Sequence, residues 1–126
     1  MKRTVLAIGA LLMSVVLCFA GFMILKSTCN KITKALDNVS QSAAEENLEE
    51  AKKSTQEAVQ LWENIHGRIE ALTKQAETDE LEETIKSLTV YAEQGNMERL
   101  YEKSEIAKNR LEHIIKNELP LFSNIF

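Results

Sequence analysis

The chain has 126 residues and a formal net charge of −4, and 44% of its residues are hydrophobic. This length allows one small domain together with a membrane anchor. Residues 26–126 carry 13 basic and 19 acidic side chains, a net charge of −6. An acidic domain has no electrostatic reason to bind nucleic acid or anionic lipid, so the composition argues against a nucleic-acid partner.

The first predicted element is an apolar segment, residues 4–25, which contains 22 residues and no charge. As a helix it would be about 33 Å long, enough for a hydrocarbon core of about 30 Å. We therefore predict a transmembrane signal-anchor over residues 1–25, in contact with the lipid bilayer through residues 4–25, and a helical domain over residues 26–126. The alternative is a signal peptide cleaved after Ala20, which would release a secreted helical protein, but the apolar run continues to Leu25 and is longer than such peptides require.

The flanking charges bear on the orientation of this anchor. Lys2 and Arg3 favour an N-terminus inside the cell, whereas Lys26, Lys31 and Lys34 favour the reverse. The order of a short basic head followed by an apolar run is typical of a signal-anchor. We therefore expect a single-pass protein of the cell membrane with an extracytoplasmic C-terminal domain.

The anchor carries a face of small residues at helical spacing, which predicts weak homodimerisation through closely approaching backbones. Its candidate dimer-face residues are Ala10, Ser14, Cys18 and, if the helix continues without a break, Cys29. In an oxidising compartment, Cys29 of two copies could form a disulfide. The alternative is that the small residues only pack within the anchor and that Cys29 is a lone thiol.

Beyond the anchor, apolar residues recur at alternating steps of three and four, the period of amphipathic helices. Two long stripes cover residues 48–76 and 97–114, and two shorter ones cover 32–39 and 81–91. Trp62 lies in the middle of the longest stripe, which favours a core position over a ligand contact. The sequence thus predicts an all-α fold, a small antiparallel four-helix bundle.

Local signals mark where these helices stop and start. Gly95 is suited to a left-handed C-cap and Asn96 to the following N-cap. Asp79, with Glu82 three residues later, predicts a helix start at Asp79. Gly67 lies inside the longest stripe, where glycine costs about 1 kcal/mol relative to alanine, and it predicts a kink or a local helix end.

The two halves of the soluble part also align with each other. Residues 32–65 can be laid on residues 81–114 without a gap, at an offset of 49 positions. Each unit is then a helical hairpin of 34 residues, the first turning in the polar stretch 40–47, and the length is that of a tetratricopeptide unit. The bundle is therefore expected to consist of two hairpins that are weakly tetratricopeptide-like.

The chain ends in an apolar tail, residues 119–126, which follows the last helix because Pro120 cannot continue it. We expect the tail to fold back into an apolar groove of the bundle, with Phe122 and Phe126 as its largest side chains; the rival interpretation is a docking peptide for a partner. Tyr91 and Tyr101 flank the Gly95 turn and are further candidates for core packing or interaction.

The order and spacing of several short segments resemble a family of domains of unknown function, family 4363. These segments are Leu61-Trp62-Glu63, Asp79-Glu80-Leu81-Glu82, Ser87-Leu88, Tyr91, Leu111-Glu112-His113-Ile114 and Asn124-Ile125-Phe126. The resemblance covers nearly the whole chain. It implies a small single-pass membrane protein of Gram-positive, often endospore-forming bacteria, with an extracytoplasmic helical domain and no assigned activity.

Residues that would carry chemistry are few. His66 and His113 are the only histidines, and neither has the cysteine or histidine spacing of a zinc site. The acidic run around Glu49 is typical of a solvated helix start rather than of a calcium loop. We therefore expect no enzyme, no cofactor and no metal. The predicted function is a non-catalytic interaction or structural module with an unidentified protein partner at the cell envelope; the alternative is a small-ligand or stress sensor.

Overall fold

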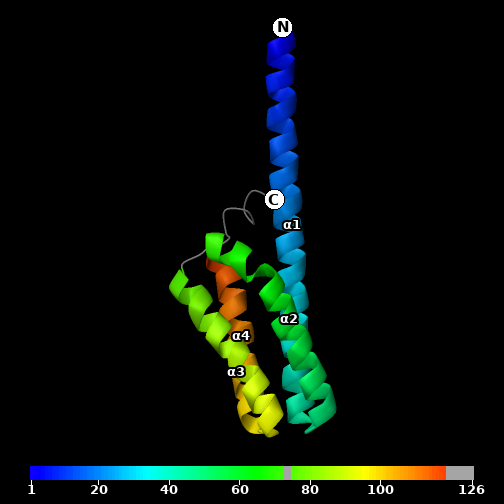
Figure 1. The fold of residues 1–126 in the computed structure, drawn as a ribbon, viewed down its shortest axis with the longest axis vertical. Coiled ribbons are helices and arrows are strands. Elements are labelled where there is room, and N and C mark those ends of the chain that lie inside the picture. The colour runs from blue at the N-terminus through cyan, green and yellow to red at the C-terminus, as the bar shows by residue number, and fades with distance from the viewer. Residues whose placement is uncertain (73–74, 119–126) are drawn as a thin grey trace.

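The computed structural model describes residues 1–72 and 75–118, and these ranges contain four helices and no strand, which confirms the predicted all-α class. The helices are α1 (Lys2–Ala44), α2 (Leu48–Leu72), α3 (Gln75–Gln94) and α4 (Met97–Glu118). The lower half of α1 packs against α2 and α4, whereas its upper half extends beyond the other described helices (Figure 1).

The longest element, α1, is one uninterrupted helix of 43 residues. Its length is about 65 Å at the usual rise per residue. The domain boundary expected after residue 25 therefore falls inside a helix. No linker separates the apolar segment from the first helix of the bundle.

The core is formed where the four helices meet. α1 packs against α2 and α4, and α3 packs against the same two helices. Most of the buried apolar side chains among the described residues lie at the positions of the apolar stripes, with exposures of 4% or less: Ile32, Leu36, Val39, Ala51, Ala58, Trp62, Ile65, Ile69, Leu81, Ile85, Leu88, Leu100, Ala107, Leu111 and Ile114. Each helix thus presents one apolar face inward, as amphipathic helices do.

The turn from α1 to α2 closes α1 with a left-handed residue. The N–H of Asn47 donates to the carbonyl of Ser42 at 2.9 Å, and the N–H of Glu46 donates to that of Ala43 at 3.1 Å. Glu46 has φ +58°, the conformation in which this motif places glycine. Asn47 then caps α2, because its side-chain oxygen accepts from the N–H of Glu50 at 3.3 Å.

The turn from α3 to α4 repeats these bonds 49 positions later. Asn96 donates to the carbonyl of Tyr91 at 3.0 Å and Gly95 donates to that of Ala92 at 3.2 Å. Gly95 has φ +69°, as its expected role in the C-cap requires. Asn96 caps α4 through the N–H of Arg99 at 3.2 Å. The two turns are therefore alike in geometry; the tetratricopeptide likeness stays a prediction.

Two alternatives were predicted at Gly67, a kink or a local helix end. α2 does not end there but runs on to Leu72, because Ile65 and Ile69 on either side are buried and their packing outweighs the cost of glycine. The last turns of α2 bend away from α1, which agrees with a kink (Figure 1). The predicted helix start at Asp79 is wrong, because α3 already contains Gln75 and Asp79 is not its cap.

The predicted turn falls within the polar stretch 40–47, but it is confined to residues 45–47 because α1 continues as far as Ala44. Ser40 lies in the core instead of in a turn, and its hydroxyl lies 2.6 Å from that of Ser104 on α4. This buried pair lets a polar residue remain on the inward face. The expected folding back of residues 119–126, including Phe122 and Phe126, lies outside the described residues.

Candidate functional site

The upper half of α1 exposes an unusual number of large apolar side chains. Exposures range from 39% to 73% for Val5, Leu6, Ile8, Leu11, Leu12, Met13, Val15, Val16, Leu17, Phe19, Met23 and Ile24. A contiguous apolar surface of this kind marks an interaction site or a membrane segment. The helix is long and apolar enough to cross a bilayer, and a signal sequence would satisfy the same criteria.

The change from exposed to buried occurs within one turn of α1. Ile24 is 57% exposed, whereas Leu25 is 3% exposed, and the buried positions continue from there along the helix. Phe22 is half-buried and packs against the same core. The bundle therefore begins where the apolar run ends. We call the end of the bundle at Leu25 the proximal end. The opposite end, with the turns at 45–47 and 95–96, is the distal end.

The candidate dimer face is divided by this change. Ala10, Ser14 and Cys18 are exposed on the upper half, and the hydroxyl of Ser14 donates to the carbonyl of Ala10 at 3.0 Å. Cys29, by contrast, is 1% exposed and belongs to the core. Burial raises the pKa of its thiol to about 11. The expectation that Cys29 continues an accessible face is thus wrong, because the neighbouring helices cover it.

Of the candidate aromatic residues, Trp62 lies in the core at 1% exposure. Its ring is tilted by 34° to that of His66, with 6.3 Å between the centroids. The indole Nε1 is buried, and no acceptor for it lies in the described ranges 1–72 and 75–118. Tyr91 is half-buried against the core, and Tyr101 is 46% exposed at the distal end.

A cavity of about 340 Å³ opens near the proximal end, between the start of α3 and the last turns of α4. It is lined by Glu77, Glu80, Asn109, Arg110, His113 and Ile114. Arg110 forms an ion pair with Glu80. One carboxylate oxygen of Glu77 is buried and has no hydrogen-bond partner among the residues that the structure describes. The cavity thus combines one ion pair, one histidine and one unpaired acceptor.

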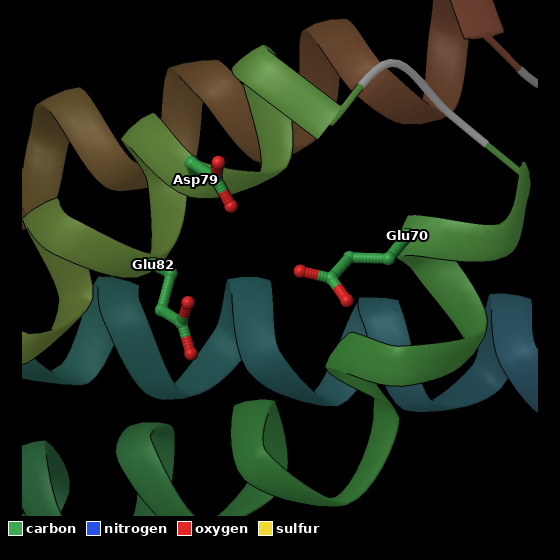
Figure 2. A group of neighbouring side chains, drawn as sticks. All are labelled: Glu70, Asp79 and Glu82. Atoms are coloured by element: carbon green, nitrogen blue, oxygen red, sulfur yellow. The ribbon is translucent and has the colours of Figure 1, made fainter.

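Three carboxylates meet beside this end, across α2 and α3. Glu70, Asp79 and Glu82 point toward one another, and each offers an oxygen within 4.8 Å of the others (Figure 2). Calcium takes six to eight oxygen ligands, so three carboxylates would supply only part of such a shell. None of the three is buried, and we assign no metal to them.

A second cavity, of about 290 Å³, lies at the distal end between the two similar turns. It is lined by Ala43, Ala44, Glu46, Met97, Glu98 and Tyr101. The sequence pointed to Tyr101 and to the turns, but it did not pair the end of α1 with the start of α4. The 49-residue offset is the signal that could have done so, because it places both turns at one end of the bundle.

The fold and the exposed half of α1 define a small all-α protein with one candidate membrane-spanning helix. A family model described as a domain of unknown function, DUF4363, matches residues 19–125, so the chain belongs to this family. The match begins inside the apolar segment and covers the whole described bundle. No curated protein and no solved structure matches the chain.

Proposed function

We propose that this protein is a non-catalytic interaction or structural module, anchored in the cell membrane by α1, that presents its bundle at the outer surface of the membrane. One observation carries the proposal: within a single helix, the large apolar side chains up to Ile24 are exposed, apart from the half-buried Phe22, and from Leu25 on the apolar face is buried in a core. Water does not accommodate the first kind of surface, whereas a bilayer does.

The unbroken α1 gives the module a defined position. Because the helix passes from the apolar segment into the core without a linker, the bundle is held directly at the membrane surface and its distal end faces away from it. A rigid support of this kind suits a protein that must meet a partner at a set distance from the bilayer. The basic head at Lys2 and Arg3 favours an extracytoplasmic bundle.

The placement of the histidines supports a non-catalytic role. His66 packs against Trp62, and its Nδ1–H donates a hydrogen bond to the carbonyl of Glu63 at 3.0 Å, which is a structural use. His113 is on another helix and lines the proximal cavity.

A small-ligand sensor is the second candidate, and the proximal cavity favours it. The unpaired carboxylate oxygen of Glu77 is the kind of acceptor that a ligand cation could use. A secreted form is also compatible with the packing, because cleavage after Ala20 would leave every core residue, from Leu25 to Ile114, in the mature chain.

Two steps test the proposal on the full chain in its native membranes. First, the protein should stay in the pellet after alkaline carbonate extraction, at the size of the intact chain. Second, a photoreactive residue is placed singly at the exposed positions of Leu48, Glu63 and Glu83, and specific protein adducts are sought on illumination. A soluble form that starts near Gly21 would refute the anchor, and the absence of adducts at all positions would refute the interaction role.

A further inference from the structure

The distal end of the bundle carries a groove that no part of the described chain fills. The distal groove is the cavity lined by Ala43, Ala44, Glu46, Met97, Glu98 and Tyr101. It forms because the turns after α1 and α3 lie side by side (Figure 1). Its lining is mostly apolar, from Ala43, Met97 and Tyr101, and it includes two exposed glutamates, Glu46 and Glu98.

Exposed apolar residues of the bundle gather at this end. Among the described residues from Leu25 to Glu118, the large hydrophobic side chains with substantial exposure are Leu48, Val90 and Tyr101. Leu48 is 40% exposed and begins α2, directly after the first distal turn, and Tyr101 is 46% exposed in the groove itself. Partly buried aromatic residues in a concave surface are typical anchors of protein interfaces.

The charge at this end selects the kind of partner. Residues 43–50 and 93–102 contain seven glutamates and one arginine, a local net charge of −6. The whole chain carries −4, so the remaining residues together carry +2. All seven glutamates are exposed. The protein is therefore polarised along the bundle, with its negative charge concentrated at the end far from the membrane segment.

We propose that the distal groove binds a basic polypeptide segment that inserts one large apolar side chain between Met97 and Tyr101 and places lysines or arginines against Glu46 and Glu98. This assignment rests on the proposed interaction role and gives that role a site and a partner chemistry. Opposite charge steers such a segment to the groove and orients it there. A second copy, a nucleic acid or an anionic bilayer would meet repulsion at the same end.

The first distal turn supplies a variant that separates binding from folding. Glu46 has φ +58°, and the equivalent residue of the second turn is Gly95. Glycine adopts this conformation without steric cost. Glu46 also places a negative charge at the C-terminus of α1, where the helix dipole disfavours it. Glu46→Gly should therefore retain or raise the melting temperature while it removes a rim charge.

The test uses the full chain in nanodiscs of phosphatidylcholine, whose headgroups carry no net charge. The probe is a fluorescent 12-residue peptide of lysines with one central tryptophan, and binding is measured by fluorescence anisotropy. The double variant Glu46→Gly, Glu98→Gln should weaken binding roughly fivefold, as expected for two partly screened ion pairs. Tyr101→Ala should weaken it about tenfold, as expected for an interface anchor.

The control variant Glu63→Gln, Glu83→Gln changes the net charge equally but lies away from the distal end, and it should bind like the native chain. A peptide with glutamate in place of lysine should not bind. Equal losses for the control and the distal variant, or tight binding that Tyr101→Ala does not affect, would overturn the proposal.

The photoreactive positions distinguish this failure from failure of the proposed function. Protein adducts at Glu63 or Glu83 without any at Leu48, together with no binding of the lysine peptide, would leave an interaction module whose site is elsewhere. Adducts at Leu48 that disappear in the double variant would support the distal groove.

Discussion

The two halves of α1 have the same backbone and opposite surroundings. Leu12 is 61% exposed in the upper half, whereas Leu36 is fully buried in the lower half. The upper half is apolar on all sides, and the lower half carries its apolar residues on one face with Lys34 and Asp37 exposed on the other. The spacing of apolar residues along the helix, more than their number, therefore distinguishes a candidate membrane-spanning segment from a segment that packs into a protein core.

The two halves of α1 are also joined without a linker. A soluble domain and its anchor are often connected by a linker, which lets the domain move independently. Here the change from an exposed to a buried face occurs between Ile24 and Leu25, in the middle of a helix. With the proposed membrane anchoring, the bundle would follow the tilt of the apolar half of α1, and the distal groove would keep a defined orientation.

The largest expected effect comes from charge in the upper half. Leu12→Arg with Val16→Arg should cost about 5–7 kcal/mol of insertion free energy, because each arginine at mid-membrane costs about 2.5–3.5 kcal/mol. Carbonate extraction should then release the protein. The matched control exchanges the two native residues, Leu12→Val with Val16→Leu, and should stay in the pellet. Release of both variants alike would show that the segment does not span the membrane.

The core offers the next largest effect. Trp62→Ala should destabilise the bundle by about 3–5 kcal/mol, because it removes a large side chain that is 1% exposed. Circular dichroism during urea unfolding of the full chain in nanodiscs measures this loss. Trp62→Phe should cost less, because it keeps most of the volume and removes an N–H that has no acceptor. An unchanged midpoint for Trp62→Ala would contradict its core position.

The same substitution in both halves gives the closest comparison. Leu36→Ala should cost about 2–5 kcal/mol of bundle stability, the range for a buried leucine. Leu12→Ala should leave the bundle unaffected, because Leu12 contacts no core residue. The chain has one tryptophan, Trp62, so its fluorescence reports unfolding of the bundle alone. Similar losses at both positions would mean that the upper half packs against protein.

Removal of the ion pair between α1 and α4 should have a small effect on stability. Lys108 pairs with Asp37 at 2.6 Å, and this hydrogen bond raises the pKa of Lys108 above its ordinary value. Lys108→Met should cost only about 0.2–1 kcal/mol, because the pair is partly exposed. The raised pKa means that the contribution is present at neutral pH and disappears as pH rises through that pKa. If Lys108→Met lowered the stability of the bundle by the same amount at pH 7 and above the raised pKa of Lys108, the contribution of this pair would not be ionic.

The sequence predicted the helices and the core better than their limits. The apolar stripes correctly predicted Trp62, Leu36 and their neighbours as core residues. The helical spacing on which they rest is a property of a whole segment and does not depend on one residue. α2 does not end at Gly67 and α3 does not start at Asp79, because these local signals are weaker than the burial of Ile69 and Thr78 beside them.

The candidate site was predicted only in part. Tyr101 was recognised from its place beside the Gly95 turn, but its neighbour Glu46 is 55 positions away in sequence and meets it only through the packing of α1 with α4. Cys29 was misplaced for the same reason. A single-helix pattern indicates which residues share a face, and only the neighbouring helices decide whether that face is covered.

The apolar segment and the core share one unbroken helix, α1. Amide hydrogen exchange of the full chain in nanodiscs, followed by mass spectrometry of peptides that cover residues 20–32, measures this continuity. We expect slow exchange throughout these peptides, at the level of the core peptides around Leu36 and Trp62, because every amide donates within one helix. Complete exchange within seconds at residues 24–30 would reveal a flexible linker and contradict this continuity.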